Sequence, residues 1–452
     1  MRRVAATVCC CLAAATSLQC ATVPPAPDRG AIARGIADRT GADAGTLEAR
    51  AAWTVPPGVT LDDGVTPDEA VGVALWNNAD FQAALASLGL VRADLVEAGL
   101  IRNPILSLLF PAGPKQLEWT VSWPVDTLWQ RPKRIAQARL NADAAAEMLV
   151  AYGLRLIADV RLAMIDAVIA ERRLALAGDQ ARLAETLARL AESRLRAGDI
   201  SAFETRLARL DAARLEAVRL THQGTRDLAV LRVRSLMGLA PESASIILAD
   251  TLPGADAPCG SLPELIRTSL GARPDVRAAE LRIESAGARA GLERTRVLAL
   301  TAALDANAQG REGFEAGPGV VAELPVFGLN QGGRARASAE VEEASRRYLA
   351  VRAAVSAEVA GAVLALRDAE GVARALGDDW TGTSRTAREQ AEHLFEAGEI
   401  SLVTLLEVRQ RLIETEHLHL DAAGGLARAR VRLEQAVGGP CNPRRDGGKV
   451  GR

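Results

Sequence analysis

The sequence is poor in aromatic residues and in lysine. Aromatic residues make up 3% of the 452 residues, and the only lysines are Lys115, Lys133 and Lys449. Few aromatics together with abundant Ala, Leu, Arg and Glu are typical of long helices packed along one another. The formal net charge is −2, so the chain lacks the basic surface of a nucleic-acid-binding protein. The composition predicts a mainly α fold and no nucleic-acid partner.

Motifs of catalysis and cofactor binding are also lacking. The sequence has no phosphate-binding loop with Lys and Ser or Thr, no HExxH, no nucleophile elbow and no paired-cysteine zinc pattern. The four histidines are His222, His393, His417 and His419. His417 and His419 are two residues apart and point to different faces of a helix. We therefore expect no enzyme activity, no cofactor and no bound metal.

The one long apolar run at the N-terminus is typical of an export signal. Two arginines precede residues 4–18, which are apolar or small, and a Pro-rich polar stretch follows. The run is too short to span a membrane, so we predict a signal peptide over residues 1–20. Cys20 closes the run and is a candidate lipid-acceptor cysteine, although SLQC places Leu and Gln where small residues are expected. Cleavage near residues 13–15 without a lipid is the alternative.

After removal of the signal, Cys259 and Cys441 are the remaining cysteines. An exported chain meets an oxidising compartment, where the two thiols could pair. Two separate thiols fit the sequence equally well, because spacing alone does not define connectivity.

The chain repeats itself at an offset of about 200 residues. RAGDISAFE at 196–204 is copied as EAGEISLVT at 396–404, and WPVDTLWQ from Trp123 is matched by LPVFGLNQ from Leu324. Repeats at a fixed period indicate duplicated structural units. The predicted segments are an extended polar stretch at 21–65, repeat 1 at 66–238, a linker at 239–261, repeat 2 at 262–438 and a C-terminal tail at 439–452.

Each repeat has the same predicted order of elements. An opening helix is followed by a β-hairpin with strands of about nine residues, a long uninterrupted helix and a return helix. The ranges are 67–102, 104–124, 132–197 and 201–238 in repeat 1, and 262–298, 299–326, 333–397 and 401–437 in repeat 2. Gly198 and Gly398 would end the long helices in the left-handed conformation, and the acid and Ser that follow suit a helix start.

The predicted hairpins have features of a membrane-spanning sheet. Their strands are long enough to cross a bilayer when tilted, and Trp119, Trp123 and Trp129 flank one hairpin as an interfacial aromatic belt would. Pro124 and Pro325 mark strand-to-helix corners. A small soluble sheet is the alternative.

Four strands cannot close a barrel, and open edges are not tolerated in lipid. Two chains would share an eight-stranded barrel and three a twelve-stranded one with a lumen. A shared barrel continued by long helices would be a conduit.

Several segments, in this order, resemble the TolC-like outer-membrane efflux protein family over residues 66–440. They are ALWNNADFQAA at 74–84, AGLIRNPILSL at 98–108, ARPDVRAAELRI at 272–283, LPVFGLNQGGR at 324–334 and EAGEISLVTLLEVRQRLIETE at 396–416. The resemblance implies a homotrimer in the outer membrane of a Gram-negative bacterium. Each protomer would give four transmembrane strands to one shared β-barrel and long helices to a coiled-coil α-barrel in the periplasm. The implied partners are outer-membrane lipid, a periplasmic adaptor protein and an inner-membrane pump, expected to be proton-driven.

The resemblance also implies functional positions at the helix tips. The expected adaptor-docking residues are Arg196, Gly198, Asp199, Ile200, Ser201, Glu396, Gly398, Glu399, Ile400 and Ser401. The expected periplasmic gate residues are Glu204, Asp211, Thr404 and Glu407. Family members commonly have Asp three residues after the tip Ser, whereas this chain has Glu204 and Thr404 there. The expected function is a channel for efflux, and the resemblance favours the heavy-metal branch of the family.

Two alternatives stay open at this stage. The same fold could serve type I protein secretion, or the chain could be a periplasmic coiled-coil lipoprotein without a pore. The sequence does not define whether the cargo is metal cations, drugs or protein.

Overall fold

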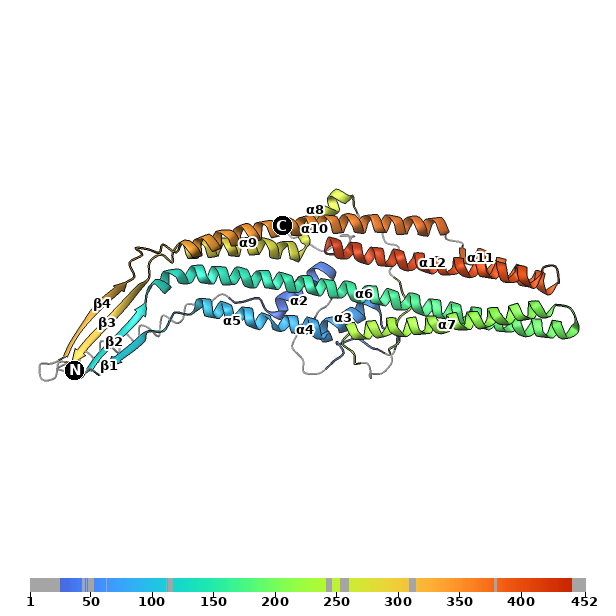
Figure 1. The fold of residues 1–452 in the computed structure, drawn as a ribbon, viewed down its shortest axis with the longest axis horizontal. Helices are drawn as coiled ribbons and strands as arrows, with labels where there is room; N and C mark the ends of the chain where they lie inside the picture. Colours follow the sequence, from blue (N-terminus) through green and yellow to red (C-terminus); the bar gives the residue numbers. More distant parts are fainter. Residues whose placement is uncertain are drawn as a thin grey trace. The chain divides into compact units, whose positions relative to one another are not determined.

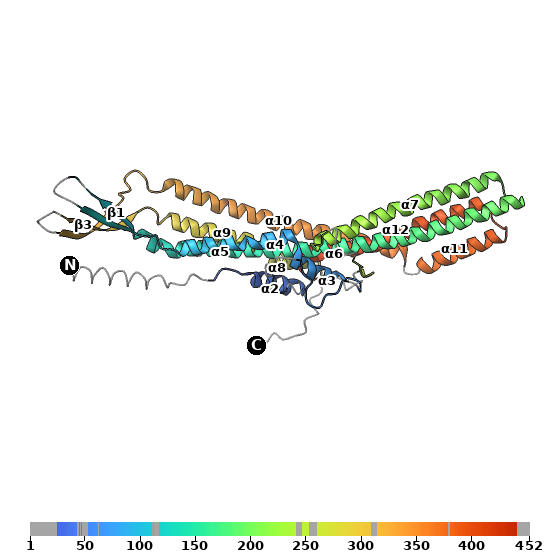
Figure 2. The same ribbon diagram turned by 90° about the horizontal axis from the view of Figure 1, so that it is seen from below.

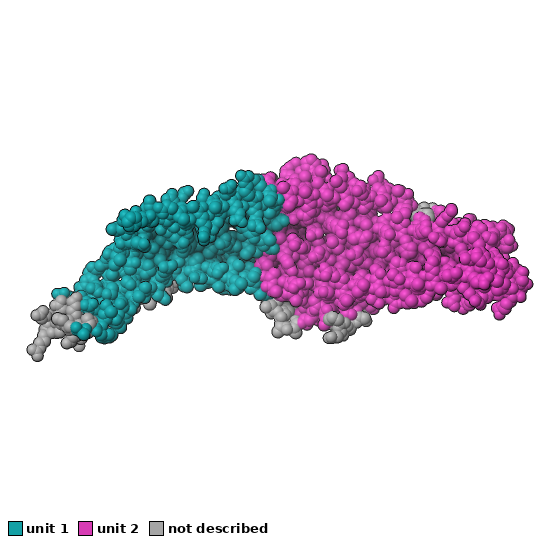
Figure 3. All heavy atoms as spheres, viewed as in Figure 1, with its two compact units in different colours: residues 1–31, 86–148, 275–351 teal, residues 32–85, 149–274, 352–452 magenta. Residues whose placement is uncertain are grey.

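The computed structural model describes most of the chain as two compact units (Figure 3). The described residues are 25–42, 45, 47, 53–61, 63–110, 112, 117–240, 246–252, 260–308, 314–377 and 380–440. Unit 1 comprises residues 1–31, 86–148 and 275–351, and unit 2 comprises residues 32–85, 149–274 and 352–452. The structure is mostly helical with one small sheet, as predicted.

Unit 1 contains a four-stranded antiparallel sheet in the order β1-β2-β3-β4 (Figure 1). The strands are β1 (Ile105–Leu109), β2 (Leu117–Pro124), β3 (Leu300–Ala308) and β4 (Phe314–Ala322). The central pair β2 and β3 joins the two hairpins, with Trp119 opposite Ala306. The Thr120 hydroxyl donates to Asp305 Oδ1 at 2.6 Å across this pair. Two hairpins distant in sequence therefore form one sheet.

Two of the four strands have the predicted length of about nine residues, and the other two are shorter. β3 and β4 have nine residues each, β2 has eight and β1 has five. Every side chain of β1 is exposed, including four large apolar ones, Ile105, Leu106, Leu108 and Leu109. Pro318 lies inside β4, which is an edge strand within the protomer.

One helix of unit 1 begins almost directly at the sheet. α6 (Asp126–Ala197) starts two residues after β2, six residues before the predicted start. Its first turn is anchored by the Val125 amide, which donates to Leu300 O at 2.9 Å. Pro132 lies inside the helix instead of opening it, so the helix gives up one backbone hydrogen bond near its start. The other helices here are α5 (Leu88–Gly99), α9 (Pro274–Glu293) and the first part of α10 (Gln331–Leu376).

The opening helices are segmented, whereas we predicted one helix in each repeat. Residues 67–102 form α3 (Pro67–Asn77), α4 (Ala79–Ala86) and α5, and residues 262–298 form α8 (Leu262–Ala272) and α9. Asn78 breaks the first: its backbone is extended, its Oδ1 accepts from the Phe81 amide at 2.9 Å, and its Nδ2 donates to Leu236 O at 3.0 Å. Arg273 breaks the second because a residue before proline avoids the helical conformation.

The second long helix is interrupted, so the prediction of an uninterrupted helix over 333–397 was wrong. α10 ends at Leu376 and α11 (Trp380–Glu396) follows. Gly377 adopts φ +74°, a left-handed conformation that ends helices and that glycine adopts without steric cost. Repeat 1 has Gly178 inside the continuous helix α6, so a glycine alone does not cause the break.

A second correction concerns residues 21–65, which we predicted to be extended. They contain helix α2 (Arg29–Thr40), whose Ile32, Ala33 and Ile36 are buried. Asp28 caps this helix by accepting from the Ala31 amide at 2.7 Å. The segment is therefore part of the core of the protein.

Unit 2 ends in two helical hairpins (Figure 2). One hairpin pairs the end of α6 with α7 (Ala202–Leu236), and the other pairs α11 with α12 (Leu402–Val437). The buried cluster between them comprises Leu187, Ala188, Ala191, Ala208, Ala391, Phe395, Leu402 and Leu405. This shared apolar core holds the two hairpins together.

One helix in the described part of the chain, α10, is long and apolar enough by length and composition to cross a membrane. Only 17% of its apolar window is buried in the protomer. Leu349 and Leu364 are more than half exposed. The helix therefore has an apolar surface that the protomer leaves uncovered.

Candidate functional site

The repeated RAGDIS and EAGEIS motifs form the tips of the two helical hairpins. After α6, Gly198 adopts φ +86°, and the Asp199 amide donates to Arg194 O at 2.9 Å. After α11, Gly398 adopts φ +78°, and the Glu399 amide donates to Leu394 O at 2.9 Å. Both are six-to-one closures of the kind that end helices at glycine. The two tips therefore share one backbone geometry.

Serine caps the helix that leaves each tip, but with different partners. Ser201 Oγ accepts from the Glu204 amide at 3.2 Å, and Glu204 Oε2 accepts from the Ser201 amide at 2.9 Å, which completes a capping box. Ser401 Oγ accepts from the Thr404 amide at 3.1 Å. Thr404 cannot return the bond as Glu204 does, so the second tip has a simpler cap.

The two tips are linked to each other by Arg194. Its Nη2 donates to Glu396 O at 3.3 Å, and its guanidinium carbon lies 4.6 Å from the centre of the Phe395 ring. Ile200 and Ile400, which we expected among the docking residues, are half-buried and pack against the cluster that joins the hairpins. Their side chains lie against the inter-hairpin core and leave other residues to form the outer surface of the tips.

The remaining predicted docking residues form that outer surface. Arg196, Gly198, Asp199, Ser201, Glu396, Gly398, Glu399 and Ser401 are all exposed. Phe203, which we did not predict, is 62% exposed one turn beyond the first tip. The tips thus present charged groups, two glycines with open space around them and one large aromatic side chain.

The four predicted gate residues differ in how free their side chains are. The Glu204 carboxylate is held by the Ser201 amide and hydroxyl, and these bonds lower the pKa of Glu204. Asp211 is half-buried and pairs with Arg214 at 3.0 Å. Thr404 and Glu407 are exposed. Of the predicted carboxylates, Glu407 is the one that faces solvent without a described partner.

A buried polar group that we did not predict interacts electrostatically with Asp211, one of the four predicted gate residues. Arg409 is 5% exposed, and burial lowers its pKa, an effect opposed by the carboxylates of Asp211 and Glu392. Its Nη1 has no hydrogen-bond partner. In sequence, Arg409 is one arginine among many on a helix, so only the packing of α12 distinguishes it. The two carboxylates that act on Arg409 of α12 come from α7 (Asp211) and α11 (Glu392).

Two stacked histidines connect α7 to α12 farther from the tips. The rings of His222 and His417 are 5.5 Å apart, and burial lowers the pKa of both, with Arg173 as an additional cause. Arg173 forms an ion pair with Asp421. Among the described residues, no group of three His, Cys, Asp or Glu side chains is arranged to hold a metal.

The histidine pair predicts that acid destabilises this bundle. Because the folded-state pKa values are lowered, the stabilisation is present above the ordinary histidine pKa of about 6.5 and is lost as pH falls toward the folded-state values. We expect the apparent melting temperature of the purified protein, followed by circular dichroism, to fall between pH 7.5 and pH 5.5. His417→Phe should flatten this dependence. An unchanged pH dependence in His417→Phe would contradict the assignment.

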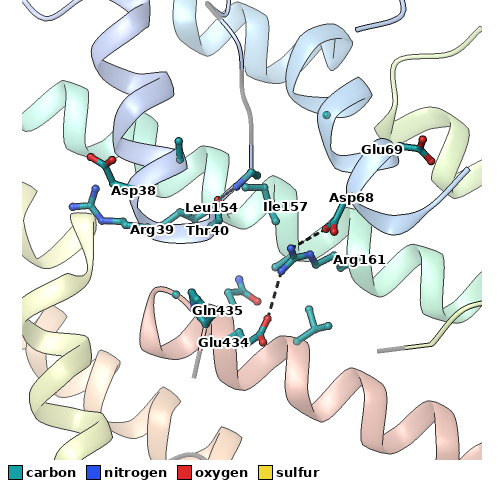
Figure 4. Close-up of a pocket in the computed structure, with 18 of the residues that line it drawn as sticks. Asp38, Arg39, Thr40, Asp68, Glu69, Leu154, Ile157, Arg161, Glu434 and Gln435 are labelled. Atoms are coloured by element: carbon teal, nitrogen blue, oxygen red, sulfur yellow. Dashed lines mark hydrogen bonds and ion pairs between the residues drawn. The ribbon is translucent and has the colours of Figure 1, made fainter. Parts of the chain in front are cut away.

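A large hollow lies elsewhere in unit 2, with a volume of about 1200 Å³ (Figure 4). Arg161 bridges its walls, donating to Asp68 at 3.2 Å and to Glu434 at 3.4 Å. Partly exposed ion pairs of this kind contribute little stability, so their main effect is to join α3, α6 and α12.

The residues that we predicted to contact the membrane or to carry its lipid anchor lie in unit 1 or outside the described residues. Trp119 and Trp123 lie in β2, and Trp129 lies in the first turns of α6, where it is 44% exposed. Pro124 is the last residue of β2, and Pro325 lies three residues beyond β4. The candidate lipidation site Cys20 and the cysteines Cys259 and Cys441 lie outside the described residues.

Comparisons with known proteins agree with this architecture. The model of the outer membrane efflux protein family matches residues 265–439. The cobalt-zinc-cadmium resistance protein CzcC of Cupriavidus metallidurans is 26% identical over 83% of this chain and 90% of its own length. The pyoverdine export outer membrane protein OpmQ of Pseudomonas putida is 26% identical over 82% of this chain and 85% of its own length.

Solved structures share the fold. CusC matches with a TM-score of 0.69 at 19% identity, covering 87% of this chain and 95% of CusC. The outer-membrane channel OprN matches with a TM-score of 0.69 at 21% identity, covering 83% of this chain and 90% of OprN. Together with the sheet and the paired hairpin tips, these matches show that the chain is similar to outer membrane efflux proteins along most of its length and shares the fold of their solved structures.

Proposed function

We propose that this protein is the outer-membrane channel of a tripartite efflux system, which conducts solutes from a periplasmic adaptor and an inner-membrane pump to the exterior. The observation that carries the proposal is the pairing of an open-edged sheet with two helical hairpins that end in matching glycine tips. The sheet is suited to insertion into lipid together with further copies of the chain. The tips are suited to contact with a periplasmic partner protein. The chain itself catalyses no reaction in this scheme.

The sheet supports a homotrimer with a shared barrel. Within the described residues, β1 and β4 each have one unpaired edge, and apolar side chains such as Leu106 and Val320 are largely exposed. In lipid each unpaired backbone group costs several kcal/mol, on the order of the penalty for a buried polar group without a partner. Three copies would pair β4 of one protomer with β1 of the next and close a barrel of twelve strands with a lumen.

Assembly and location test this proposal against a scaffold without a pore. We expect the full-length protein to migrate as a heat-sensitive trimer band when outer-membrane fractions are run unboiled in detergent gels. A monomer in the soluble periplasmic fraction would overturn the channel. The same experiment on the tip variants described below separates loss of assembly from loss of docking.

The exposed tips support docking of a periplasmic adaptor protein. Their glycines have open space where a side chain would be, so a partner can approach the backbone closely. Arg196 and Glu399 offer charges of opposite sign at the surface. The half-buried Ile200 and Ile400 would fix the distance between the two tips.

Glu407 supports a charged constriction just beyond the tips. A ring of three exposed carboxylates, one per protomer, would favour cations over anions in a narrow pore. We expect Glu407→Gln to reduce the cation selectivity of single channels in planar bilayers. Glu204→Gln is the matched control, because the Glu204 carboxylate caps a helix. The cation selectivity of this variant should stay close to that of the wild type. Equal selectivity in Glu407→Gln and wild type would contradict the assignment.

Metal cations are the cargo that we favour. The relative CzcC, named for cobalt, zinc and cadmium resistance, aligns over nine-tenths of its own length. Relatives named for export of pyoverdine and toluene match over a similar share of the chain. Drug efflux is therefore the second candidate, and type I protein secretion by the same fold is the third.

A further inference from the structure

A hollow of about 350 Å³ lies where the sheet of unit 1 meets its helices. It is separate from the tips, the gate and the hollow of Figure 4. Its lining residues are Arg102, Asp126, Thr127, Gln130, Arg134, Arg296, Leu298 and Ala299. Three arginines and one carboxylate therefore surround a single small space.

The arginines of this hollow carry positive charge that the described residues do not match. Arg134 is partly buried, and its pKa is lowered by burial and then by the charges of Arg102, Arg296 and Arg131. Its Nη2 donates to Leu100 O at 3.1 Å, but its buried Nε has no partner. An unpartnered guanidinium nitrogen among like charges is costly unless an anion binds there.

The carboxylates near the hollow already have partners. Glu293 pairs with Arg296 at 2.7 Å and also accepts from Asn330 Nδ2 at 2.8 Å. Asp126 Oδ2 accepts from Gln130 Nε2 at 3.2 Å. Two carboxylates, Asp126 and Glu293, face the three arginines that line the hollow, so a local excess of positive charge remains. The positive charge around the hollow is therefore not fully balanced by these carboxylates.

The position of the hollow indicates the source of an anion. Asp126 follows the end of β2 by two residues, and Ala299 directly precedes β3. Trp123 Nε1 donates to Arg102 O at 2.8 Å, which holds the arginine next to the strand ends. If the strands span the membrane, as the proposed function requires, their helix-proximal ends lie at its periplasmic surface, where phosphate groups of lipids are dense.

We propose that this hollow binds the phosphate group of an acidic phospholipid at the periplasmic surface of the outer membrane, an inference that rests on the proposed function. Guanidinium groups match phosphate oxygens with paired N–H donors. The buried hydroxyl and amide of Thr127 and Gln130 line the same space. Leu298, 43% exposed, would lie beside the glycerol and the first methylenes of the lipid. A zwitterionic choline headgroup would bring its ammonium near the arginines and bind less well.

Native mass spectrometry of the full-length, detergent-purified protein tests this site. The protein is incubated with phosphatidylglycerol or phosphatidylcholine, and retained lipid is counted per protein. We expect preferential retention of phosphatidylglycerol. Arg102→Gln combined with Arg134→Gln should lower this retention on the order of tenfold. Arg346→Gln is the matched control, because Arg346 is a highly exposed arginine on α10 paired only at 3.9 Å with Glu342.

Three results would overturn the proposal. One is equal retention of the two lipids, a second is equal retention in the double variant and in Arg346→Gln, and a third is complete displacement of the lipid by millimolar inorganic phosphate, which would assign the hollow to free anions. Single Arg102→Gln, at an exposed position, keeps the test valid where the double variant does not fold. Because retention is measured on purified protein, its failure is distinguishable from a failure of efflux, which is scored by growth of cells.

Discussion

Replacing Gly198 and Gly398 together with tryptophan is expected to abolish efflux while leaving the trimer in the outer membrane. Both glycines have positive φ, so each substitution costs about 1–2 kcal/mol in backbone strain. A Cβ at either position meets nothing within 4 Å, so the new side chains point into open space and cover the tip surface. The measurement is growth of a deletion strain that carries the variant, under the toxic compound that the wild type confers resistance to.

Gly377→Trp is the matched control for this variant. Gly377 also ends a helix with positive φ, +74°, and also has open space around it, but it lies at the break between α10 and α11. It should keep resistance. If the tip variant loses the trimer from the outer membrane, or if Gly377→Trp loses resistance equally, the glycines serve helix-turn stability and not docking.

Replacing Leu210 and Leu228 together with glutamate is expected to prevent trimer assembly. These side chains are 68% and 69% exposed in the protomer and lie about five helical turns apart, on the same face of α7. That face is opposite the one that buries Ala208 and Leu215 against the protomer core. A second copy would cover these leucines, each worth about 1.5–3 kcal/mol when buried, whereas a buried unpaired glutamate would be strongly unfavourable.

Assembly of the leucine variants is measured as the trimer band in unboiled outer-membrane fractions. Leu210→Met combined with Leu228→Met is the control, because methionine keeps the apolar volume and should preserve the trimer. A trimer band of normal intensity in the glutamate variant would show that this face of α7 is not between copies.

Local chemistry accounts for the features that could be predicted from the sequence. Gly198 and Gly398 mark the tips because a left-handed helix end selects glycine, and Ser201 and Ser401 follow because a helix start selects a side-chain acceptor. Pro124 and Pro325 marked the ends of the two β-hairpins, and tryptophans flanked the first of them. These signals depend on a few adjacent residues and are independent of the rest of the fold.

Features set by distant packing could not be predicted. Helix α2 was not predicted, because its sequence is rich in small residues. Its formation depends on the burial of Ile32 and Ile36. Whether a glycine breaks a helix differs between Gly178, inside α6, and Gly377, at the end of α10. Arg409 becomes special only because α7, α11 and α12 enclose it.

The unmatched charge around Arg134 is a further case of this kind. Arg102, Arg134 and Arg296 come from three segments of the chain, and nothing in their separate contexts indicates that they meet. The strand order places the start of β3 beside the end of β2 and so brings the three segments together. Sheet topology, not motif, therefore creates this candidate site.

The most direct test of the proposed efflux function is the growth of a strain lacking this protein across graded cobalt, zinc, cadmium and copper. The same strain is grown in parallel across dyes, detergents and antibiotics. We predict hypersensitivity to divalent metals that the wild-type gene restores and the double tip-glycine variant does not. Sensitivity confined to the organic compounds would contradict the metal assignment. Unchanged growth in both panels, in a strain that also lacks its other outer-membrane efflux channels, would contradict the role of this protein as an efflux channel.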